Sequence, residues 1–281
     1  MKVTEQERAE LKPEVDKLVE KSKEVIRDTF SKYKIEDMAI TWTGGKDSTL
    51  TLWIIRQVCL EDKIQIPKAM TIDEFDVFQE IHDFMEKYTK EWNLDLEWCR
   101  NDDVVKAAGS KLNNIVKVKD LDERNQAELK RIGFEEDSFP FEAESYTGNH
   151  LMKTVEFNKY IERRNVKAIF QGLRRDEQSA RIQDDYYEKK EAAHLIPEHM
   201  RIKPILHFSE RQVWKAYKVY GIPYCALYEQ GYRSLGAKTT SAIAESGVPA
   251  WEQDLEHTTE RAGRRQDKEQ MMGRLRKLGY M

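Results

Sequence analysis

TWTGGKDST, at residues 41–49, joins two apolar stretches of different kinds. The stretch before it, residues 37–42, is short and continuous, which predicts a buried strand. The stretch after it, residues 48–55, has the apolar density of a packed helix, and the glycine pair in between marks a turn. A strand, a glycine turn and a helix in this order form the place where an open parallel sheet holds its ligands.

Strand and helix predictions alternate on either side of this turn. On the N-terminal side, apolar residues recur along one helix face from Leu11 to about Ser31. On the C-terminal side we expect strands at residues 66–72, 94–98, 166–170 and 201–205, and helices at 77–92 and from Ser209 onward. This alternation requires parallel pairing. We therefore predict an α/β fold with a doubly wound, mainly parallel five-stranded sheet, helices on both faces and a C-terminal extension.

The composition excludes several classes of protein. The 281 residues carry 47 Lys and Arg against 51 Asp and Glu, a formal net charge of −4, so no general excess of positive charge attracts nucleic acid or anionic membrane. No apolar run approaches the roughly 20 residues of a membrane helix, and the N-terminal residues are too polar for a signal peptide. We expect a cytoplasmic protein without membrane or nucleic-acid partners, whose anion sites are local clusters.

The three cysteines, Cys59, Cys99 and Cys225, lie far apart in the sequence. Their spacing argues against a disulfide framework, a zinc site or an iron–sulfur cluster. We expect each of them to be a small buried side chain.

The glycine loop also has the composition of an anion site. Gly44 and Gly45 allow close backbone approach, and the free N–H groups at the start of the next helix point into the turn. Lys46 and the hydroxyls of Thr43 and Ser48 add donors. Together they predict a phosphate cradle. The loop is not a Walker A sequence, which needs a longer glycine turn.

A second polar cluster, residues 171–181, follows the fourth predicted strand and is expected at the same edge of the sheet. Arg174, Arg175 and Arg181 are permanently charged donors suited to a phosphate or sulfate oxyanion. Asp176 and Glu177 can orient them or help to hold Mg²⁺, which prefers oxygen ligands. The alternative is a solvated loop with internal ion pairs.

Two further stretches complete the pattern: RIKPILHFSE at residues 201–210 and GIPYCALYEQGYRSLG at 221–236. With GLRRDE at 172–177, they resemble the phosphoadenosine phosphosulfate reductase superfamily. That superfamily also contains the small subunit of two-subunit sulfate adenylyltransferase and eukaryotic-type FAD synthetase. The glycine loop is similar to the PP-motif of the N-type ATP pyrophosphatases, with Thr43 where that motif usually has Ser. The resemblance covers residues 36–281 and is weakest over 101–150.

The resemblance implies an adenine nucleotide alpha hydrolase-like fold that cleaves ATP between its α and β phosphates, with Mg²⁺. It implies that ATP is held by Thr43, Gly44, Gly45, Lys46, Asp47, Ser48, Asp73, Gly172 and Arg233. It also implies catalytic roles for Lys46, Arg174, Arg175 and Arg181, and metal ligation by Asp47 and Asp176. In sulfate-activating relatives a Thr-Gly pair follows the aspartate of the second strand, whereas Asp73 is followed here by Glu74 and Phe75.

On this basis we divide the chain into three parts. Residues 1–35 form an N-terminal helix, and residues 36–210 form the nucleotide-binding α/β domain. Residues 211–281 form a helical and loop extension that completes the site, with a charge-dense solvated helix from about Trp251. Within the α/β domain, residues 101–150 are rich in polar side chains with patchy periodicity, which predicts an irregular insertion or lid.

We expect an adenylyltransferase similar to the sulfate adenylyltransferase small subunit, in which an oxyanion attacks the α-phosphorus of ATP and expels pyrophosphate. A reductase would need a C-terminal cysteine, but none follows Cys225, whereas residues 258–280 are similar to the end of the small subunit. The alternatives are a sulfonucleotide reductase or sulfurtransferase, an FMN adenylyltransferase, and a non-catalytic nucleotide-binding subunit. The implied partners are ATP, a small oxyanion or FMN, and a GTPase large subunit. His207, between two apolar neighbours, is expected in the core or an interface rather than in acid–base chemistry.

Overall fold

The computed structural model describes residues 1–142, 145–178, 181–258 and 260. Its centre is a six-stranded sheet in the order β3-β2-β1-β6-β8-β7. The strands are β1 (Met38–Thr41), β2 (Lys68–Ile72), β3 (Leu96–Cys99), β6 (Ala168–Phe170), β7 (Tyr187–Lys190) and β8 (His199–Ile202). All neighbouring pairs are parallel except β7 with β8. The predicted mainly parallel α/β fold is confirmed.

The sheet has one strand more than the five predicted. The additional strand, β7, reads Tyr187-Glu188-Lys189-Lys190 and shows no run of apolar residues. It lies at the edge of the sheet, where charged side chains are common. Lys203 is buried behind it and forms an ion pair with Glu188 at 2.8 Å. An edge strand of this kind leaves no periodic apolar signal in the sequence.

Helices cover both faces of the sheet. Four of them share one apolar core with Met38 and Ile40: α1 (Glu5–Lys32), α2 (Lys46–Asp62), α3 (Gln79–Glu91) and α8 (Glu210–Tyr220). Ala39 points the other way, to the face on which Phe157 and Ile161 of α7 (Glu156–Arg164) pack. Successive side chains of a strand alternate between faces, so the continuous apolar stretch in the sequence reflects burial on both sides.

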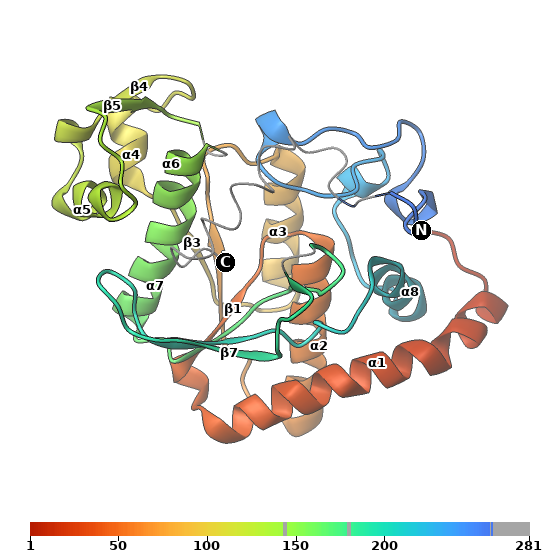
Figure 1. Ribbon diagram of the computed structural model, residues 1–281. Helices are drawn as coiled ribbons and strands as arrows, with labels where there is room; N and C mark the ends of the chain where they lie inside the picture. The colour runs from red at the N-terminus through yellow and green to blue at the C-terminus, as the bar shows by residue number, and fades with distance from the viewer. Residues whose placement is uncertain (143–144, 179–180, 259, 261–281) are drawn as a thin grey trace.

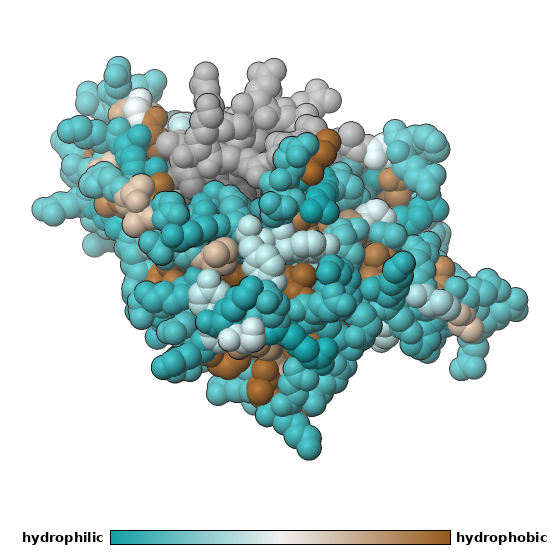
Figure 2. Space-filling model, turned by 60° about the horizontal axis from the view of Figure 1, so that its bottom comes forward, coloured by the Kyte–Doolittle hydropathy of each residue, from teal (hydrophilic) through white to brown (hydrophobic). Residues whose placement is uncertain are grey.

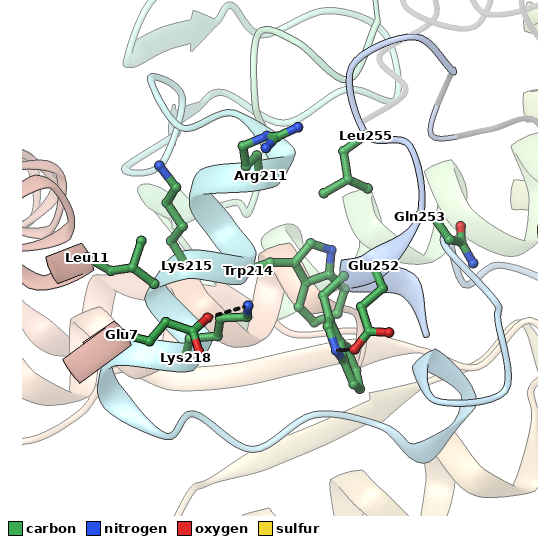
Figure 3. Close-up of a pocket in the computed structure, with 10 residues that line it drawn as sticks. Glu7, Leu11, Arg211, Trp214, Lys215, Lys218, Glu252, Gln253 and Leu255 are labelled. Carbon is green, nitrogen blue, oxygen red and sulfur yellow. Dashed lines mark hydrogen bonds and ion pairs between the residues drawn. The ribbon is translucent and has the colours of Figure 1, made fainter. Parts of the chain in front are cut away.

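The N-terminal helix α1 packs against α2 and α8 (Figure 1). A cavity of about 330 Å³ lies between α1, α8 and residues 251–255 (Figure 3). The lysines along this face of α8 form ion pairs with glutamates of α1: Lys218 with Glu7 at 2.8 Å, and Lys215 with Glu14 at 2.6 Å. These partly exposed ion pairs add to the apolar contacts that α1 and α8 make in their shared core.

Residues 101–142 form a small unit with helices and strands of its own, whereas the sequence predicted an irregular insertion or lid over residues 101–150. Its elements are α4 (Asp102–Ala107), β4 (Ile115–Lys117), α5 (Glu123–Arg131) and β5 (Ser138–Pro140), with β4 and β5 antiparallel (Figure 1). Their apolar side chains form a core of their own with residues of the π-helical turn η3 (His150–Val155), which joins α6 (Tyr146–Asn149) to α7. These elements have only three to nine residues each, which is too short for a clear helical period.

The face of the molecule drawn in Figure 2 is mostly hydrophilic, with apolar residues in small groups. None of the described helices is both long enough and apolar enough to cross a membrane. Cys59, Cys99 and Cys225 are buried, as predicted. The predicted C-terminal helix lies largely outside the described residues, and the described part near its start is a 3₁₀ turn, η7 (Ala250–Glu252).

Candidate functional site

The glycine loop connects the end of β1 to the first turn of α2, as predicted. Gly44 has a φ of +73°, a conformation that favours glycine, and a Cβ on it would lie 3.0 Å from Ile81 of α3. Gly45 is the N-cap of α2 and has a φ of −72°. The atom nearest to a Cβ on Gly45 would be Thr43 Oγ1, at 3.4 Å. Of these two glycines, Gly44 is therefore the one whose backbone conformation requires a glycine.

A buried tryptophan and two hydroxyls hold the loop in place. Trp42 is fully buried, and its indole N–H donates to Thr49 Oγ1 in the first turn of α2 at 2.9 Å. The backbone N–H of Thr43 donates to Ser48 Oγ at 3.2 Å, and the Ser48 hydroxyl donates to the carbonyl of Gly45 at 3.1 Å. The Thr43 hydroxyl lies 3.1 Å from Ser48 Oγ, so the hydroxyls of both residues close the loop onto the helix that follows it.

The second predicted cluster meets the glycine loop at the carboxyl edge of the sheet. β6 pairs with β1, and the residues after β6 run directly past the start of α2. A Cβ on Gly172 would lie 2.6 Å from both the backbone nitrogen and the Cα of Ser48. The two loops meet where the chain connections leave β1 and β6 in opposite directions, which is where open α/β sheets bind ligands.

Lys46 lies at the centre of the site and is only 2% exposed. Its Nζ donates to Glu260 Oε1 at 2.5 Å and to the carbonyl oxygen of Arg233 at 3.3 Å. Asp47 Oδ2 and Glu210 Oε1 lie 3.4 Å and 3.7 Å from the same Nζ. Burial disfavours the ammonium, but the nearby carboxylates outweigh this effect and raise the pKa of Lys46 above its ordinary value. Lys46 is therefore charged.

Arg174 supplies the second buried cation, with 1% of its side chain exposed. Its guanidinium bonds to Asp47 and Glu260, and its Nε donates to Asp176 Oδ1 at 2.8 Å. Glu260 thus receives one bond from Lys46 and one from Arg174. Burial opposes its ionisation, but these two cations prevail and hold the pKa of Glu260 well below its usual range.

The other two arginines of the cluster are placed differently. Arg175 points away from the loop, and its Nε and Nη2 donate to the carbonyl of Asp184 at 3.1 Å and 3.0 Å. Arg181 forms an ion pair with Glu177, and Glu177 lines the loop cavity described below. Of the three predicted arginines, Arg174 bonds to Asp47 and Glu260 beside Lys46, Arg181 pairs with Glu177 at the wall of the loop cavity, and Arg175 bonds to the carbonyl of Asp184.

Arg233 is buried and organises the segment near the C-terminus. Its Nη2 donates to Glu210 Oε2 at 2.8 Å and to the carbonyl of Thr258 at 3.1 Å, and its Nη1 donates to the carbonyl of Asp254 at 3.2 Å. Burial raises the pKa of Glu210, which faces both Lys46 and Arg233. The guanidinium expected to contact a ligand is occupied by contacts within the protein, so Arg233 acts as a positioning residue.

Two adjoining cavities lie beside the loop. The loop cavity, of about 120 Å³, is lined by Lys46, Asp47, Gly172, Glu177, Tyr228, Ser234 and Glu260 among others. The apolar cavity, of about 190 Å³, is lined mainly by Met70, Ile72, Val77, Ile81, Met85 and Trp98. Both are also lined by Thr43 and Leu235, so a ligand can extend from one into the other.

Asp73 does not line either of these cavities. Its Oδ1 accepts a hydrogen bond from the backbone N–H of Phe75 at 2.8 Å, and its side chain lines a separate depression with Arg100. The next residue, Glu74, lines the apolar cavity and forms an ion pair with Lys153 of η3 at 2.8 Å. Glu74, and not the predicted Asp73, therefore lies at the wall of the apolar cavity.

The two carboxylates expected to hold Mg²⁺ are already engaged. Asp176 Oδ1 accepts from Arg174, and its Oδ2 accepts from the backbone N–H of Glu210 at 2.7 Å, in the first turn of α8. Asp47 pairs with Arg174 and Lys46, and burial raises its pKa. Among the described residues no three acidic, histidine or cysteine side chains form a metal cage. Asp47 and Asp176 in this arrangement do not fit a resident metal ion.

Several residues of the site were missed from the sequence. The Tyr228 hydroxyl accepts the backbone N–H of Lys46 at 2.8 Å, and the Tyr217 hydroxyl donates to the carbonyl of Lys46 at 2.6 Å. Glu210 and Tyr228 lie within stretches that carry the family resemblance, which could have singled them out. Glu260 also lies in a stretch that carries the resemblance, residues 258–280, but no local pattern singles it out there. His207 is half-buried and its Nε2 bonds to the carbonyl of Leu18 at 3.0 Å, which places it between α1 and the core as expected.

Comparisons with known proteins confirm the superfamily resemblance. Residues 113–242 match the model of the phosphoadenosine phosphosulfate reductase domain, a range that leaves out the glycine loop. Phosphoadenosine 5'-phosphosulfate reductase of Xanthomonas oryzae is 32% identical over 100 residues, which are 36% of this chain and 39% of the relative. The chain thus spans well under half of the reductases it matches. Sulfate adenylyltransferase subunit 2 of Pseudomonas savastanoi is 24% identical over 255 residues, 84% of this chain and 72% of the relative.

The fold is also found in a solved structure of an adenylyltransferase. Candida glabrata FMN adenylyltransferase, in complex with FAD and inorganic pyrophosphate, superposes with a TM-score of 0.65 over 90% of this chain and 91% of that one. The sequence identity is 17%, so this likeness concerns the fold. The proteins to which the chain is similar are enzymes, both adenylyltransferases and reductases.

Proposed function

We propose that this chain is an adenylyltransferase that binds ATP across the two adjoining cavities and cleaves it between the α and β phosphates. One observation carries the proposal. Two buried cations, Lys46 and Arg174, meet on a single carboxylate at the N-terminus of α2. A position shared by two cations and a helix N-terminus favours a phosphate group.

The apolar cavity supports a nucleoside beside that position. Its aliphatic and aromatic walls suit the face of a base, while Thr43 and Leu235 lie between it and the phosphates. The volumes are small, about 190 Å³ and 120 Å³, so ATP binding requires side chains to move apart. Glu260, which lies inside the loop cavity, is one side chain that has to move.

The proposed reaction is an in-line displacement at the α-phosphorus. An oxygen of the acceptor forms a bond to this phosphorus, and the bond to the bridging oxygen of the β-phosphate breaks. The electron pair of that bond leaves with pyrophosphate. Lys46 and Arg174 would stabilise this leaving group through charge and position. The protein makes no covalent bond in this scheme, so the rate depends on how these groups are held.

Sulfate is the first acceptor to test, because the relative that aligns over most of the chain is a sulfate adenylyltransferase subunit. FMN is the second, because a depression of about 460 Å³ adjoins the apolar cavity at Trp98. There Trp98 stacks on His82 with ring centroids 4.5 Å apart, and the cations of the depression, Arg100, Lys159 and Arg163, are each paired with a carboxylate. The aromatic surface suits a flat ring, and a phosphate on that ring would have to compete with these carboxylates for the cations.

The thiol chemistry of a reductase is less well supported. Burial raises the pKa of Cys99 and Cys225 to about 11 and that of Cys59 to about 12. A nucleophilic cysteine needs an accessible thiolate, and these three side chains are buried and protonated at neutral pH. A reductase of this type would have to take its thiol from another protein.

Release of pyrophosphate from MgATP tests the proposal directly. We expect release that depends on sulfate, molybdate or FMN, and the acceptor that supports it identifies the branch. A GTPase subunit, the partner we expect, should be included in a parallel set of reactions. Tight ATP binding without pyrophosphate release under every condition would favour a non-catalytic binding subunit. An absence of both would refute the assigned site.

A further inference from the structure

We infer that Glu260 is a built-in competitor of phosphate, whose carboxylate occupies the anion position of the site and has to leave before ATP binds. The inference rests on the proposed function, because it takes Lys46 and Arg174 as the phosphate-binding pair. It adds a residue and a regulatory role that the adenylyl-transfer scheme does not need.

The first observation is the way in which the two carboxylate oxygens are shared. Lys46 Nζ bonds to Oε1 at 2.5 Å, and Arg174 Nη2 bonds to Oε2. Each oxygen of the Glu260 carboxylate is thus bonded to a different cation. Two oxygens of one phosphate group could bind the same two cations in the same way. Only 8% of the Glu260 side chain is exposed, so water does not replace either bond. Charge-assisted bonds of this type are among the strongest in proteins.

The second observation is that the chain leading to Glu260 is anchored. Arg233 bonds to the carbonyls of Asp254 and Thr258, and the Gln253 amide donates to the carbonyls of Gly231 and Val248 at 3.0 Å each. The carboxylate is therefore presented only two residues beyond a fixed point. A tethered group acts at a high effective concentration, so it competes strongly with a ligand in solution.

The third observation links this anchor to the site itself. Arg233 Nη2 donates both to the carbonyl of Thr258 and to Glu210 Oε2, and Glu210 Oε1 lies 3.7 Å from Lys46 Nζ. The carbonyl of Arg233 also accepts a bond from Lys46. When a phosphate replaces Glu260, the net charge around Lys46 and Glu210 changes. Arg233, which pairs with Glu210, also anchors the 254–258 segment. Occupancy of the site is coupled to the position of this segment.

The decisive experiment uses inorganic pyrophosphate as the probe, with EDTA present so that no metal ion can bridge it to a carboxylate. Titration calorimetry compares the full-length wild type with Glu260→Gln, which keeps the shape of the side chain and removes its charge. We expect pyrophosphate to bind the variant about ten-fold more tightly or better, because two charge-assisted bonds no longer compete. The control is Glu256→Gln, in the same segment, whose partner Arg211 lies on the surface. Its affinity should stay within two-fold of the wild type.

Equal or weaker binding by Glu260→Gln would overturn the inference, and would leave the proposed function standing if the wild type still releases pyrophosphate from MgATP. No binding of pyrophosphate or ATP by any of the three proteins would refute the proposed function and the inference together. A second measurement does not depend on a substitution. Hydrogen exchange of the wild type should show faster exchange of the backbone amides of residues 250–258 when pyrophosphate is added. Unchanged exchange with pyrophosphate bound would contradict displacement of Glu260.

Discussion

Gly172 lies so close to Ser48 that a Cβ on the glycine would come within 2.6 Å of the serine backbone nitrogen and Cα. This contact joins the loop after β6 to the first turn of α2. Neither backbone can move without its strand, because β1 and β6 are hydrogen-bonded neighbours in the middle of the sheet. The two predicted site clusters can thus lie this close together because Gly172 has no side chain.

Gly172→Ala should therefore lower stability and disturb the site together. The new methyl group meets backbone atoms rather than a flexible side chain, and overpacking of this kind costs about 1–3 kcal/mol. We expect a lower midpoint of thermal unfolding and a loss of ATP binding. The matched control is Gly45→Ala, whose Cβ has no protein atom nearer than 3.4 Å and whose φ is −72°. A stability of Gly172→Ala equal to that of the control would contradict this account of the contact.

Lys46→Met should destabilise the ligand-free protein, because it leaves Glu260, Asp47 and Glu210 with less compensating charge. Removal of one partner from a buried ion pair typically costs about 3–5 kcal/mol. Glu260→Gln in the same chain should restore part of this loss, which denaturant unfolding of the two single variants and the double variant can measure. Strict additivity of the two substitutions would show that the side chains do not interact. The double variant should not release pyrophosphate, since the cation is still missing.

Arg174 and Arg175 are adjacent in sequence but differ in direction, so the pair offers a sharp comparison. Arg174→Gln should reduce acceptor-dependent pyrophosphate release by about 100-fold or more, a typical loss for one group that stabilises developing charge. Arg175→Gln should keep release near the wild-type rate, because its guanidinium bonds to the carbonyl of Asp184. The steady-state kinetics of both variants should be compared together with the midpoints of their unfolding, so that a folding defect is told apart from a loss of activity. Equal losses in the two variants would refute the assignment of Arg174.

The stability of the protein should fall when the pH is lowered from about 6.5 toward 4, partly because of His199. Its Nδ1 is 2.8 Å from the carbonyl of Pro197, and its Nε2 accepts from Arg201 Nε at 3.2 Å, so the neutral ring is the form that fits. Burial, together with Arg201, lowers the pKa of His199 to about 4. Between that value and the unfolded pKa near 6.5, only the unfolded chain takes up the proton, which favours unfolding.

The size of this effect is on the order of 3 kcal/mol for a single histidine with such a shift. Urea unfolding at pH 7 and pH 4.5 should show it, and His199→Gln should flatten the difference because glutamine does not titrate. His150 and His207, whose pKa values are also lowered by burial, should leave a residual slope in the variant. An unchanged slope in His199→Gln would show that this ring is not responsible.

The order of elements around the glycine loop was predictable because its signals are local. A short apolar run, a glycine pair and a helical apolar pattern occupy adjacent positions, and each depends on neighbours within a few residues. The placement of residues 171–181 at the same sheet edge followed from the parallel pairing of β1 and β6. β7 and the unit at residues 101–142 could not be predicted in this way, since their elements are short or charged and are held by contacts from elsewhere.

The sequence by itself determined that this chain folds as a parallel α/β sheet with a glycine turn at its carboxyl edge, because strand and helix periodicities are properties of consecutive residues. Only the tertiary structure decided which charged groups meet there. It turned Arg174 inward and Arg175 outward, used Arg233 as an anchor, and brought Glu260 to Lys46 across 214 residues of chain. The direction of a long side chain depends on the packing of segments that are distant in sequence, and that information is absent from any local pattern.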